Sequence, residues 1–187
     1  MRGGTPRPAD VKQQITDALL QLLDKKSLEK ITVRELAELC GISRQTFYYH
    51  FEDVFDVVDW WSRQSAEQML RDSMRAQDER EALRIFVDRV TANRGTLRRL
   101  LASRWREQME RQLVDVFTTY LRYMLRSAHP HLAMSPSDES AFLLFYASGV
   151  SGLLIQREIH TEAEKEILVN QLYWLLFQNP WGHIRRA

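Results

Sequence analysis

Apolar residues near the N-terminus recur at steps of three and four residues, which is the spacing of one face of a helix. The first stripe predicts a helix over residues 10–24 and consists of Val11, Ile15, Ala18, Leu19, Leu22 and Leu23. A shorter helix is predicted from about Val33, because Thr32 and Glu35 have the spacing of a capping box. The residues expected on its inner face are Leu36, Leu39 and Cys40.

Gly41 follows the second stripe, where glycine commonly permits a left-handed helix end. Ser43 can then cap a third helix. That helix is expected to end near His50, because Glu52 and Asp53 have the character of an acidic first turn of a new helix. Two short helices joined by a tight glycine turn are typical of a helix-turn-helix.

The rest of the chain also follows the helical period. A long helix is predicted over residues 53–75, and the later helical segments are 79–92, 95–102, 104–128, 137–158 and 162–178. No segment shows the alternation and turn signals of strands. We therefore expect an all-α chain of about nine helices, in which a long helix joins a three-helix N-terminal helix-turn-helix bundle to a C-terminal helical bundle.

Charge and composition exclude several classes of protein. The 187 residues carry a net charge of +1, so DNA or RNA would have to be bound by a local surface rather than by a basic molecule as a whole. No run reaches about 18 uninterrupted apolar residues, and no apolar run follows "MRGGTPRP", so neither a membrane span nor a secretion signal is expected. The single cysteine, Cys40, is interpreted as a packed apolar residue rather than a reactive thiol.

The third helix carries side chains suited to DNA. In a helix-turn-helix the second helix enters the major groove, and its first residues reach base edges. The residues at those positions are Ser43, Arg44, Gln45 and Thr46. Arginine can bind guanine bidentately, glutamine can bind adenine, and a threonine methyl can contact thymine. Tyr48, Tyr49 and His50 follow, and their polar ends can donate hydrogen bonds to phosphates.

The aromatic residues of this block are expected to divide between inside and outside. Phe47 and Phe51 lie four residues apart and are expected to pack in the core. The alternative for Tyr48 and Tyr49 is that both are ordinary half-buried tyrosines. Adjacent residues lie about 100° apart on a helix, so at least one of the two must face outward.

The segment from about Ala9 to Trp60, with "ITVRELAELCGISRQTFYYHFEDVFDVV" at its centre, resembles the DNA-binding domain of the TetR family of transcriptional regulators. The resemblance implies a DNA-binding domain over residues 9–69, with its motif at 32–51, and a divergent helical ligand-binding and dimerisation domain over 70–187. It also implies that Thr32 and Arg34 lie near phosphates, that residues 43–46 read bases, and that residues 48–50 grip the backbone.

One position departs from the family pattern. Members commonly have a Lys four residues after the His, where it touches a phosphate, and this chain has Val54 there. We therefore expect one fewer phosphate contact and a shallower salt dependence. The run "RQTFYYHF" is most similar to the subgroup of the dihydroxyacetone kinase operon regulators, in which some members activate through a partner protein.

The C-terminal part holds candidate positions for self-association and for a ligand. In TetR-like proteins the last two long helices pair across a two-fold axis, and small residues let two helices approach closely. The candidate interface residues are Ala147, Ser148, Gly149, Ser151, Gly152, Leu168, Leu172 and Leu175. The candidate lining residues of a small-molecule cavity are Phe86, Trp105, Met109, Phe117, Tyr120 and Tyr123. For both sets, packing within the chain's own core is the alternative.

No enzymatic activity, cofactor or metal site is expected. No nucleophile, phosphate loop or pair of carboxylates appears, and His129 and His131 have no Cys or acidic residue at metal-binding spacing. The sequence favours a cytoplasmic, nucleoid-associated regulator that binds a palindromic DNA operator as a homodimer and represses under the control of a small molecule. The alternative is a coactivator or adaptor of the same fold that acts through a partner protein.

Overall fold

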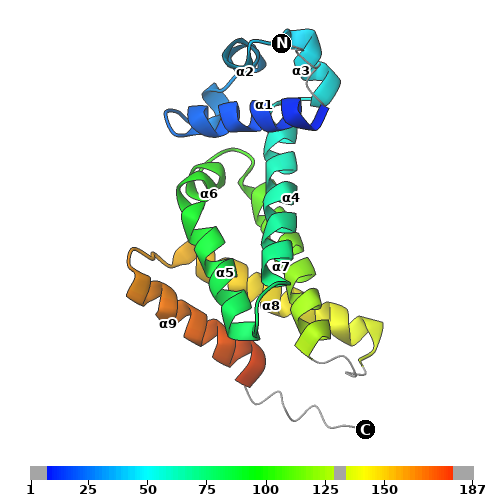
Figure 1. The fold of residues 1–187 in the computed structure, drawn as a ribbon, viewed down its shortest axis with the longest axis vertical. Helices are drawn as coiled ribbons and strands as arrows, with labels where there is room; N and C mark the ends of the chain where they lie inside the picture. Colours follow the sequence, from blue (N-terminus) through cyan, green and yellow to red (C-terminus); the bar gives the residue numbers. More distant parts are fainter. Residues whose placement is uncertain (1–7, 129–133, 179–187) are drawn as a thin grey trace, which may run out of the picture. The chain divides into compact units, whose positions relative to one another are not determined.

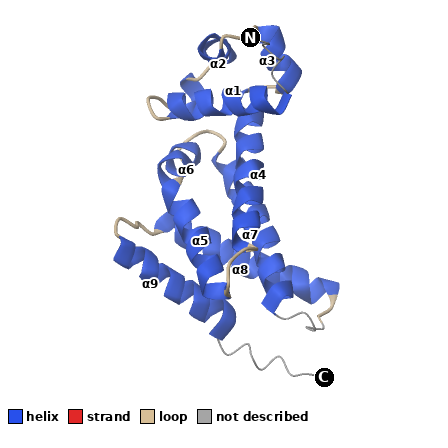
Figure 2. Cartoon of the chain, in the orientation of Figure 1, coloured by secondary structure: helices blue, strands red, loops and turns tan. Residues whose placement is uncertain are grey.

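The protein is all-α in a computed structural model that describes residues 8–128 and 134–178 (Figures 1 and 2). Within these residues the chain forms nine α-helices and no strand, which confirms the predicted fold class. The α-helices are α1 (Pro8–Leu23), α2 (Val33–Cys40), α3 (Arg44–His50), α4 (Val54–Ser73), α5 (Glu79–Ala92), α6 (Arg94–Leu101), α7 (Arg106–Ala128), α8 (Pro136–Gln156) and α9 (Glu162–Tyr173). A 3₁₀ turn, η1 (Leu28–Lys30), precedes α2, and a π-helical segment, η2 (Trp174–Gln178), continues α9.

The described residues pack into two compact units. Unit 1 contains the chain up to Ser65 together with Gly95–Met109, and unit 2 contains Ala66–Arg94 together with the chain from Glu110 onward. Unit 1 thus includes a later segment, α6 and the start of α7, in addition to the N-terminal helices. The sequence predicts a single boundary instead, after residue 69. The division into DNA-binding and ligand-binding domains by function stays a prediction.

The core of unit 1 forms where the apolar stripes of α1, α2 and α3 meet. Ile15, Leu36 and Phe47 are fully buried in it. The side chain of Gln14 donates to the carbonyl of Cys40 at 2.9 Å, and this bond joins α1 to the end of α2. The thiol of Cys40 is buried as expected, and burial raises its pKa.

The structure corrects one residue of the predicted core. Leu39 is 52% exposed, whereas Leu36, Ala37 and Cys40 are buried. Each residue of a helix is turned by about 100° from the one before it, so a short helix with Leu36 and Cys40 inward presents Leu39 to the side. The prediction that Leu39 lies on the inner face is wrong.

The later segment is fixed to unit 1 by polar and aromatic contacts. Arg99 pairs with the carboxylate of Asp24 at 2.6 Å, and the backbone N–H of Arg104 donates to Glu29 at 2.8 Å. This backbone hydrogen bond is the main reason why the pKa of Glu29 is lowered. The ring of Trp105 stacks on Phe55 with the centroids 5.6 Å apart. The segment from α6 to the start of α7 is therefore attached to unit 1 by residues that are distant in the sequence.

Unit 2 is built from the end of α4 with α5, α7, α8 and α9. Helices α5 and α9 lie side by side (Figure 1), and the guanidinium of Arg84 binds the carboxylate of Glu166 through bonds of 2.7 and 2.8 Å. A capping box of Thr161 and Glu164 opens α9. Ser135 caps α8, and Pro136 is the first residue of this helix.

Helix α8 is the one helix in the described part of the chain that is long and apolar enough to cross a membrane by length and composition alone, with a mean hydropathy of 1.2. A core helix of a folded bundle passes the same test. Leu143, Ala147, Val150 and Leu154 of α8 are buried in the core of unit 2.

Candidate nucleic-acid interface

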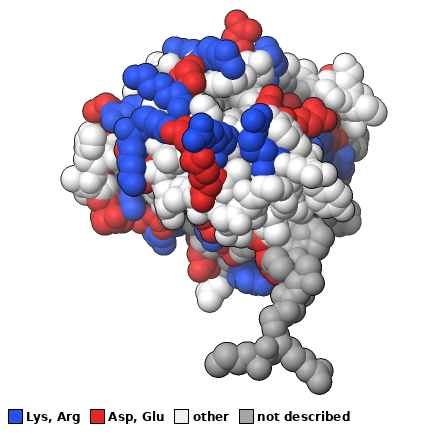
Figure 3. Space-filling model, turned by 90° about the horizontal axis from the view of Figure 1, so that it is seen from above, with Lys and Arg blue, Asp and Glu red and all other residues white. Residues whose placement is uncertain are grey.

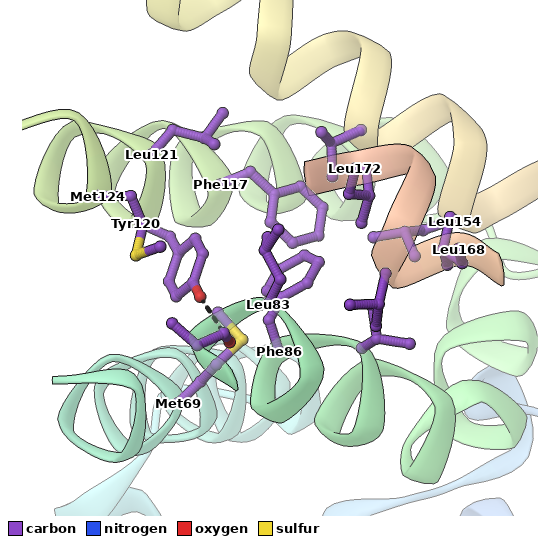
Figure 4. Packing of buried hydrophobic residues seen from close by; sticks show 14 of the residues in the cluster. Met69, Leu83, Phe86, Phe117, Tyr120, Leu121, Met124, Leu154, Leu168 and Leu172 are labelled. Carbon is purple, nitrogen blue, oxygen red and sulfur yellow. Dashed lines mark hydrogen bonds between the residues drawn. The ribbon is translucent and has the colours of Figure 1, made fainter. Parts of the chain in front are cut away.

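Unit 2 contains a small apolar cavity that bears on the predicted ligand site. It is lined by Leu83, Phe86, Phe117, Tyr120, Leu121, Val150, Leu172 and Leu176. The volume open to the centre of a water-sized sphere is about 10 Å³, which is room for about one water molecule. Figure 4 shows Phe86 from α5 facing Phe117 and Tyr120 from α7. The cavity is therefore too small to hold a ligand larger than water without a rearrangement of its lining.

Three of the six residues predicted to line a ligand cavity meet there. Phe86, Phe117 and Tyr120 line it, and the buried hydroxyl of Tyr120 donates to the carbonyl of Ala82 at 3.0 Å. Burial raises the pKa of Tyr120 to about 12, so the hydroxyl is a permanent donor at neutral pH. Tyr123 packs at the edge of the same core but does not line the cavity.

Trp105 and Met109, also predicted to line the ligand cavity, pack instead in the core of unit 1. The helical pattern continues smoothly from Trp105 into α7, and the sequence gives no sign that the first turn of α7 belongs to a different unit from the rest. Met109 is 2% exposed. Neither residue is available to the cavity in unit 2.

The residues predicted to form a dimer interface differ in their exposure to solvent. Ala147, Ser151, Leu168 and Leu172 are buried in the chain's own core and are therefore not surface residues of this structure. The family resemblance and the spacing of small residues predict them as interface residues, and the same spacing serves helix packing within unit 2. Ser148 and Gly149 are exposed, whereas Gly152 and Leu175 are half-buried. Large apolar residues outside the predicted set are also exposed on these helices, namely Leu144, Phe145, Leu153, Ile167 and Trp174.

No group of three or more His, Cys, Asp or Glu side chains that could hold a metal ion occurs among the residues that the structure describes. The two loop histidines, His129 and His131, lie outside those residues. The surface charges are mixed. On the face shown in Figure 3, Lys and Arg side chains lie among acidic side chains and broad uncharged areas.

In unit 1 a tight turn positions α3. Gly41 adopts a left-handed conformation, with φ at 64°, and the N–H of Ile42 returns to the carbonyl of Ala37 at 3.0 Å. This pair of features closes α2 as a glycine-ended helix. The hydroxyl of Ser43 accepts from the N–H of Thr46 at 3.0 Å and so caps α3. The sequence predicts both ends, because each depends on residues within one turn.

The aromatic residues of α3 divide as predicted. Phe47 and Phe51 are 0% and 2% exposed, with their ring centroids 6.0 Å apart, and they attach α3 to the core of unit 1. Tyr48 is 51% exposed and Tyr49 is 80% exposed. A tyrosine that is 80% exposed leaves most of its apolar surface in water, which is unusual unless a partner covers it.

The predicted base-reading positions lie on the exposed side of α3. Ser43, Arg44 and Gln45 are exposed, and Thr46 is half-buried with its hydroxyl 2.8 Å from that of Ser43. The predicted phosphate contacts on α2 are also exposed. Thr32 forms the predicted capping box with Glu35, and the guanidinium of Arg34 is held by Glu38 at 2.7 Å. All of these residues belong to unit 1.

A lysine that the sequence did not single out lies at the far end of α3. The ammonium of Lys12, on α1, sits 4.9 Å from the centroid of the Phe51 ring. His50, the last residue of α3, has a lowered pKa because it is partly buried and because the charge of Lys12 is close to it. The ring of Tyr49 meets that of His50 edge to face, with the centroids 5.0 Å apart. A lysine, a histidine and an exposed tyrosine therefore lie together.

A comparison with protein families matches residues 15–53 to the bacterial regulatory proteins of the tetR family. The matched segment contains α2, the glycine turn and α3, so the similarity to this family falls on the predicted helix-turn-helix. A curated relative, the uncharacterized HTH-type transcriptional regulator YxbF of Bacillus subtilis (strain 168), is 35% identical over 52 residues. Those residues are 28% of this chain and only 14% of the relative, so the likeness is confined to one domain of each protein.

Solved structures share the whole fold. The dihydroxyacetone kinase operon activator DhaS matches over 89% of this chain and 94% of its own, with a TM-score of 0.69 and 15% identity. The TetR-family repressor AlkX from Dietzia sp. strain DQ12-45-1b matches over 94% of this chain and 98% of its own, with a TM-score of 0.58 and 17% identity. At these identities the likeness concerns the fold. The named matches are regulators of transcription, in agreement with the expectation that the chain is not an enzyme.

Val54, the residue that departs from the family pattern, begins α4. Val54 is half-buried and packs against the core of unit 1 at the first position of α4. The acidic residues before it have a local role, because Asp53 accepts from the N–H of Asp56 at 2.9 Å and thereby caps the new helix. The acidic segment is thus explained by the start of α4.

Proposed function

We propose that the chain is a DNA-binding regulator of transcription that places α3 in the major groove of its operator. The observation that carries the proposal is the outward face of α3, where an arginine, a glutamine and two exposed tyrosines stand on a helix fixed by two buried phenylalanines. A helix of this kind can contact base edges with its first turn and phosphates with its last. The family of the tetR-type domain supports the same function.

The test is DNA binding to the region upstream of the chain's own gene. Replacement of Arg44 by Ala together with Tyr49 by Phe is expected to weaken binding at least tenfold, because a bidentate guanine contact and a phosphate contact are both removed. The matched control is Arg75→Ala, which removes the same charge from an exposed position of unit 2. If the double variant binds as tightly as the wild type and with the same salt dependence, α3 is not the reading helix.

We further propose that the chain acts as a homodimer on a palindromic operator. Leu144, Phe145 and Leu153 on α8 are 57%, 71% and 37% exposed, and several large apolar residues exposed on one helix are typical of an interface. A Cβ placed on Gly149 or Gly152 would meet no atom within 4 Å, so another helix could approach α8 closely at these residues. A two-fold dimer would present two copies of α3 one helical turn of DNA apart.

An effector of this regulator would be a small and mostly apolar molecule that enlarges the cavity of unit 2. The lining is apolar apart from the Tyr120 hydroxyl. Any effector would have to open the cavity, since its present size admits about one water molecule. Straight-chain alcohols of increasing length are suitable probes. They are expected to raise the thermal midpoint of the chain, and substitution of Phe117 by Trp, which fills the cavity, is expected to abolish the rise.

The direction of regulation is a separate part of the proposal, for which we favour repression. The two structural neighbours differ, since DhaS is named an activator and AlkX a repressor. A reporter gene behind the upstream region, measured with and without the chain in the cytoplasm of a host cell, distinguishes the two. Higher expression without the chain supports repression, whereas lower expression supports a coactivator role.

A further inference from the structure

The C-terminal end of α3 needs a positive charge if it is to hold a phosphate. The carbonyl end of a helix carries partial negative charge, and α3 ends at His50. Two exposed carboxylates, Glu52 and Asp53, follow directly. A phosphate that approaches Tyr49 and His50 would therefore meet a repulsive field unless a cation lies nearby. Val54, the position at which similar proteins carry lysine, supplies none.

Lys12 brings a cation to this end from a different helix. The first turns of α1 lie beside α3 (Figure 1), and Phe51, whose ring Lys12 covers, is the residue directly after His50. In the part of the chain that the structure describes, the Lys12 ammonium forms no ion pair with a carboxylate. Its stem is half-buried. The charge is thus held in place by an aromatic ring and remains available to an anion.

We propose that Lys12 is a phosphate-binding residue, which supplies from α1 the positive charge that position 54 lacks and grips the DNA backbone together with Tyr49 and His50. The inference rests on the proposed DNA-binding function. An ammonium on an aromatic face keeps N–H donors directed away from the ring, so Lys12 can bind Phe51 and a phosphate oxygen at the same time. Because the contact is to the backbone, it contributes to affinity for any sequence.

The test compares the salt dependence of DNA binding in single variants of the full chain. Two duplexes serve as probes, one from the region upstream of the gene and one with the same bases scrambled. Lys12→Gln is expected to weaken binding to both duplexes severalfold and to make the slope of log K against log salt shallower by about 1. Lys25→Gln, which removes an exposed lysine just after the other end of α1, is the matched control and is expected to keep the wild-type slope.

A second variant separates a phosphate contact from a role in packing. Lys12→Gln combined with Val54→Lys moves the charge to the position that similar proteins use, and it is expected to recover the wild-type slope. If the double variant behaves like Lys12→Gln, or if Lys12→Gln itself keeps the wild-type slope and affinity, Lys12 serves only to cover Phe51 and the inference is overturned. The proposed function is judged separately by Arg44→Ala, which must lose the preference for the upstream duplex.

Discussion

Gly41 lies between α2 and α3 in a backbone conformation that favours glycine, although there is space around it for a side chain. Its φ is 64°, and no atom lies within 4 Å of the place that a Cβ would occupy. Gly41→Ala is therefore expected to lower the free energy of unfolding by about 1 kcal/mol through backbone strain alone. Gly41→Asn should cost less, since asparagine tolerates the left-handed region. Urea unfolding of the two variants checks the order, and an Ala variant as stable as the wild type would contradict it.

His50 predicts a pH dependence of stability whose sign follows from its environment. Partial burial and the charge of Lys12 lower its pKa in the folded chain below the ordinary value of 6.5. The unfolded chain then binds the proton more readily, so the free energy of unfolding falls as the pH drops through 6.5 towards the folded pKa. His50→Gln is expected to be less sensitive over this range. Urea unfolding at pH 7.5 and at pH values below 6 measures the difference, and equal losses in both proteins would exclude His50 as the cause.

At the scale of single residues, the sequence predicts local roles well and contacts between helices poorly. The caps at Thr32 and Ser43 and the inward phenylalanines follow from residues within a few positions of each other. Leu39 was placed inside because it is apolar, although the rotation of a short helix turns it outward. Lys12 could not be found at all from the sequence, since its partner Phe51 lies on the far side of two intervening helices in the chain.

Helix α3 is short enough for its cap to matter to the whole element. Ser43→Ala removes the acceptor for the N–H of Thr46 and is expected to cost about 1 kcal/mol of stability. Ser43→Asp keeps an acceptor at the same place, and it should leave the free energy of unfolding close to that of the wild type. The new carboxylate would nevertheless face phosphates, so Ser43→Asp is expected to lose DNA affinity more than Ser43→Ala does.

The comparison of the two Ser43 variants separates folding from binding. Chemical unfolding ranks their stability, and binding to the upstream duplex ranks their affinity. Opposite orders in the two measurements are the expected result. If both measurements give the same order, the position acts on DNA only through the stability of α3.

The sequence predicts where the helices lie along the chain, but it does not predict which helices pack against each other. The nine α-helices of the described residues follow from the apolar period and from caps within one turn, and their bounds agree with the predicted ranges to within a few residues. The sequence does not reveal that α6 and the first turn of α7 join unit 1, because this depends on distant pairs such as Arg99 with Asp24. For the same reason Trp105 and Met109 were grouped with residues of the other unit.

The surface of the molecule has apolar residues exposed on α8, which the overall composition does not reveal. A net charge of +1 and a mixture of charges leave electrostatics to local groups, whereas apolar residues gather on the outward side of α8. The sequence identified α8 as an interface by its small residues, yet the buried ones among them are core. Large apolar residues of α8 that the small-residue pattern does not include, among them Leu144 and Phe145, are exposed. Whether a residue of α8 faces the core or a partner depends on how the other helices of unit 2 pack against it, which the helical period alone does not specify.

Self-association is therefore tested best at Phe145, which is 71% exposed. Phe145→Glu would place a charge in the proposed interface and remove a large apolar contact, so the dissociation constant of the dimer is expected to rise at least about 30-fold, corresponding to a loss of about 2 kcal/mol. Met74→Glu is the matched control, because Met74 is also a large apolar residue of unit 2, at 56% exposure, but lies outside α8. Sedimentation velocity over a range of concentrations measures both. In the proposed dimer two copies of α3 would hold one palindromic operator, so Phe145→Glu should also weaken binding to a full operator more than to a half-site. A dimer that survives Phe145→Glu, with Met74→Glu unchanged, would place the interface elsewhere.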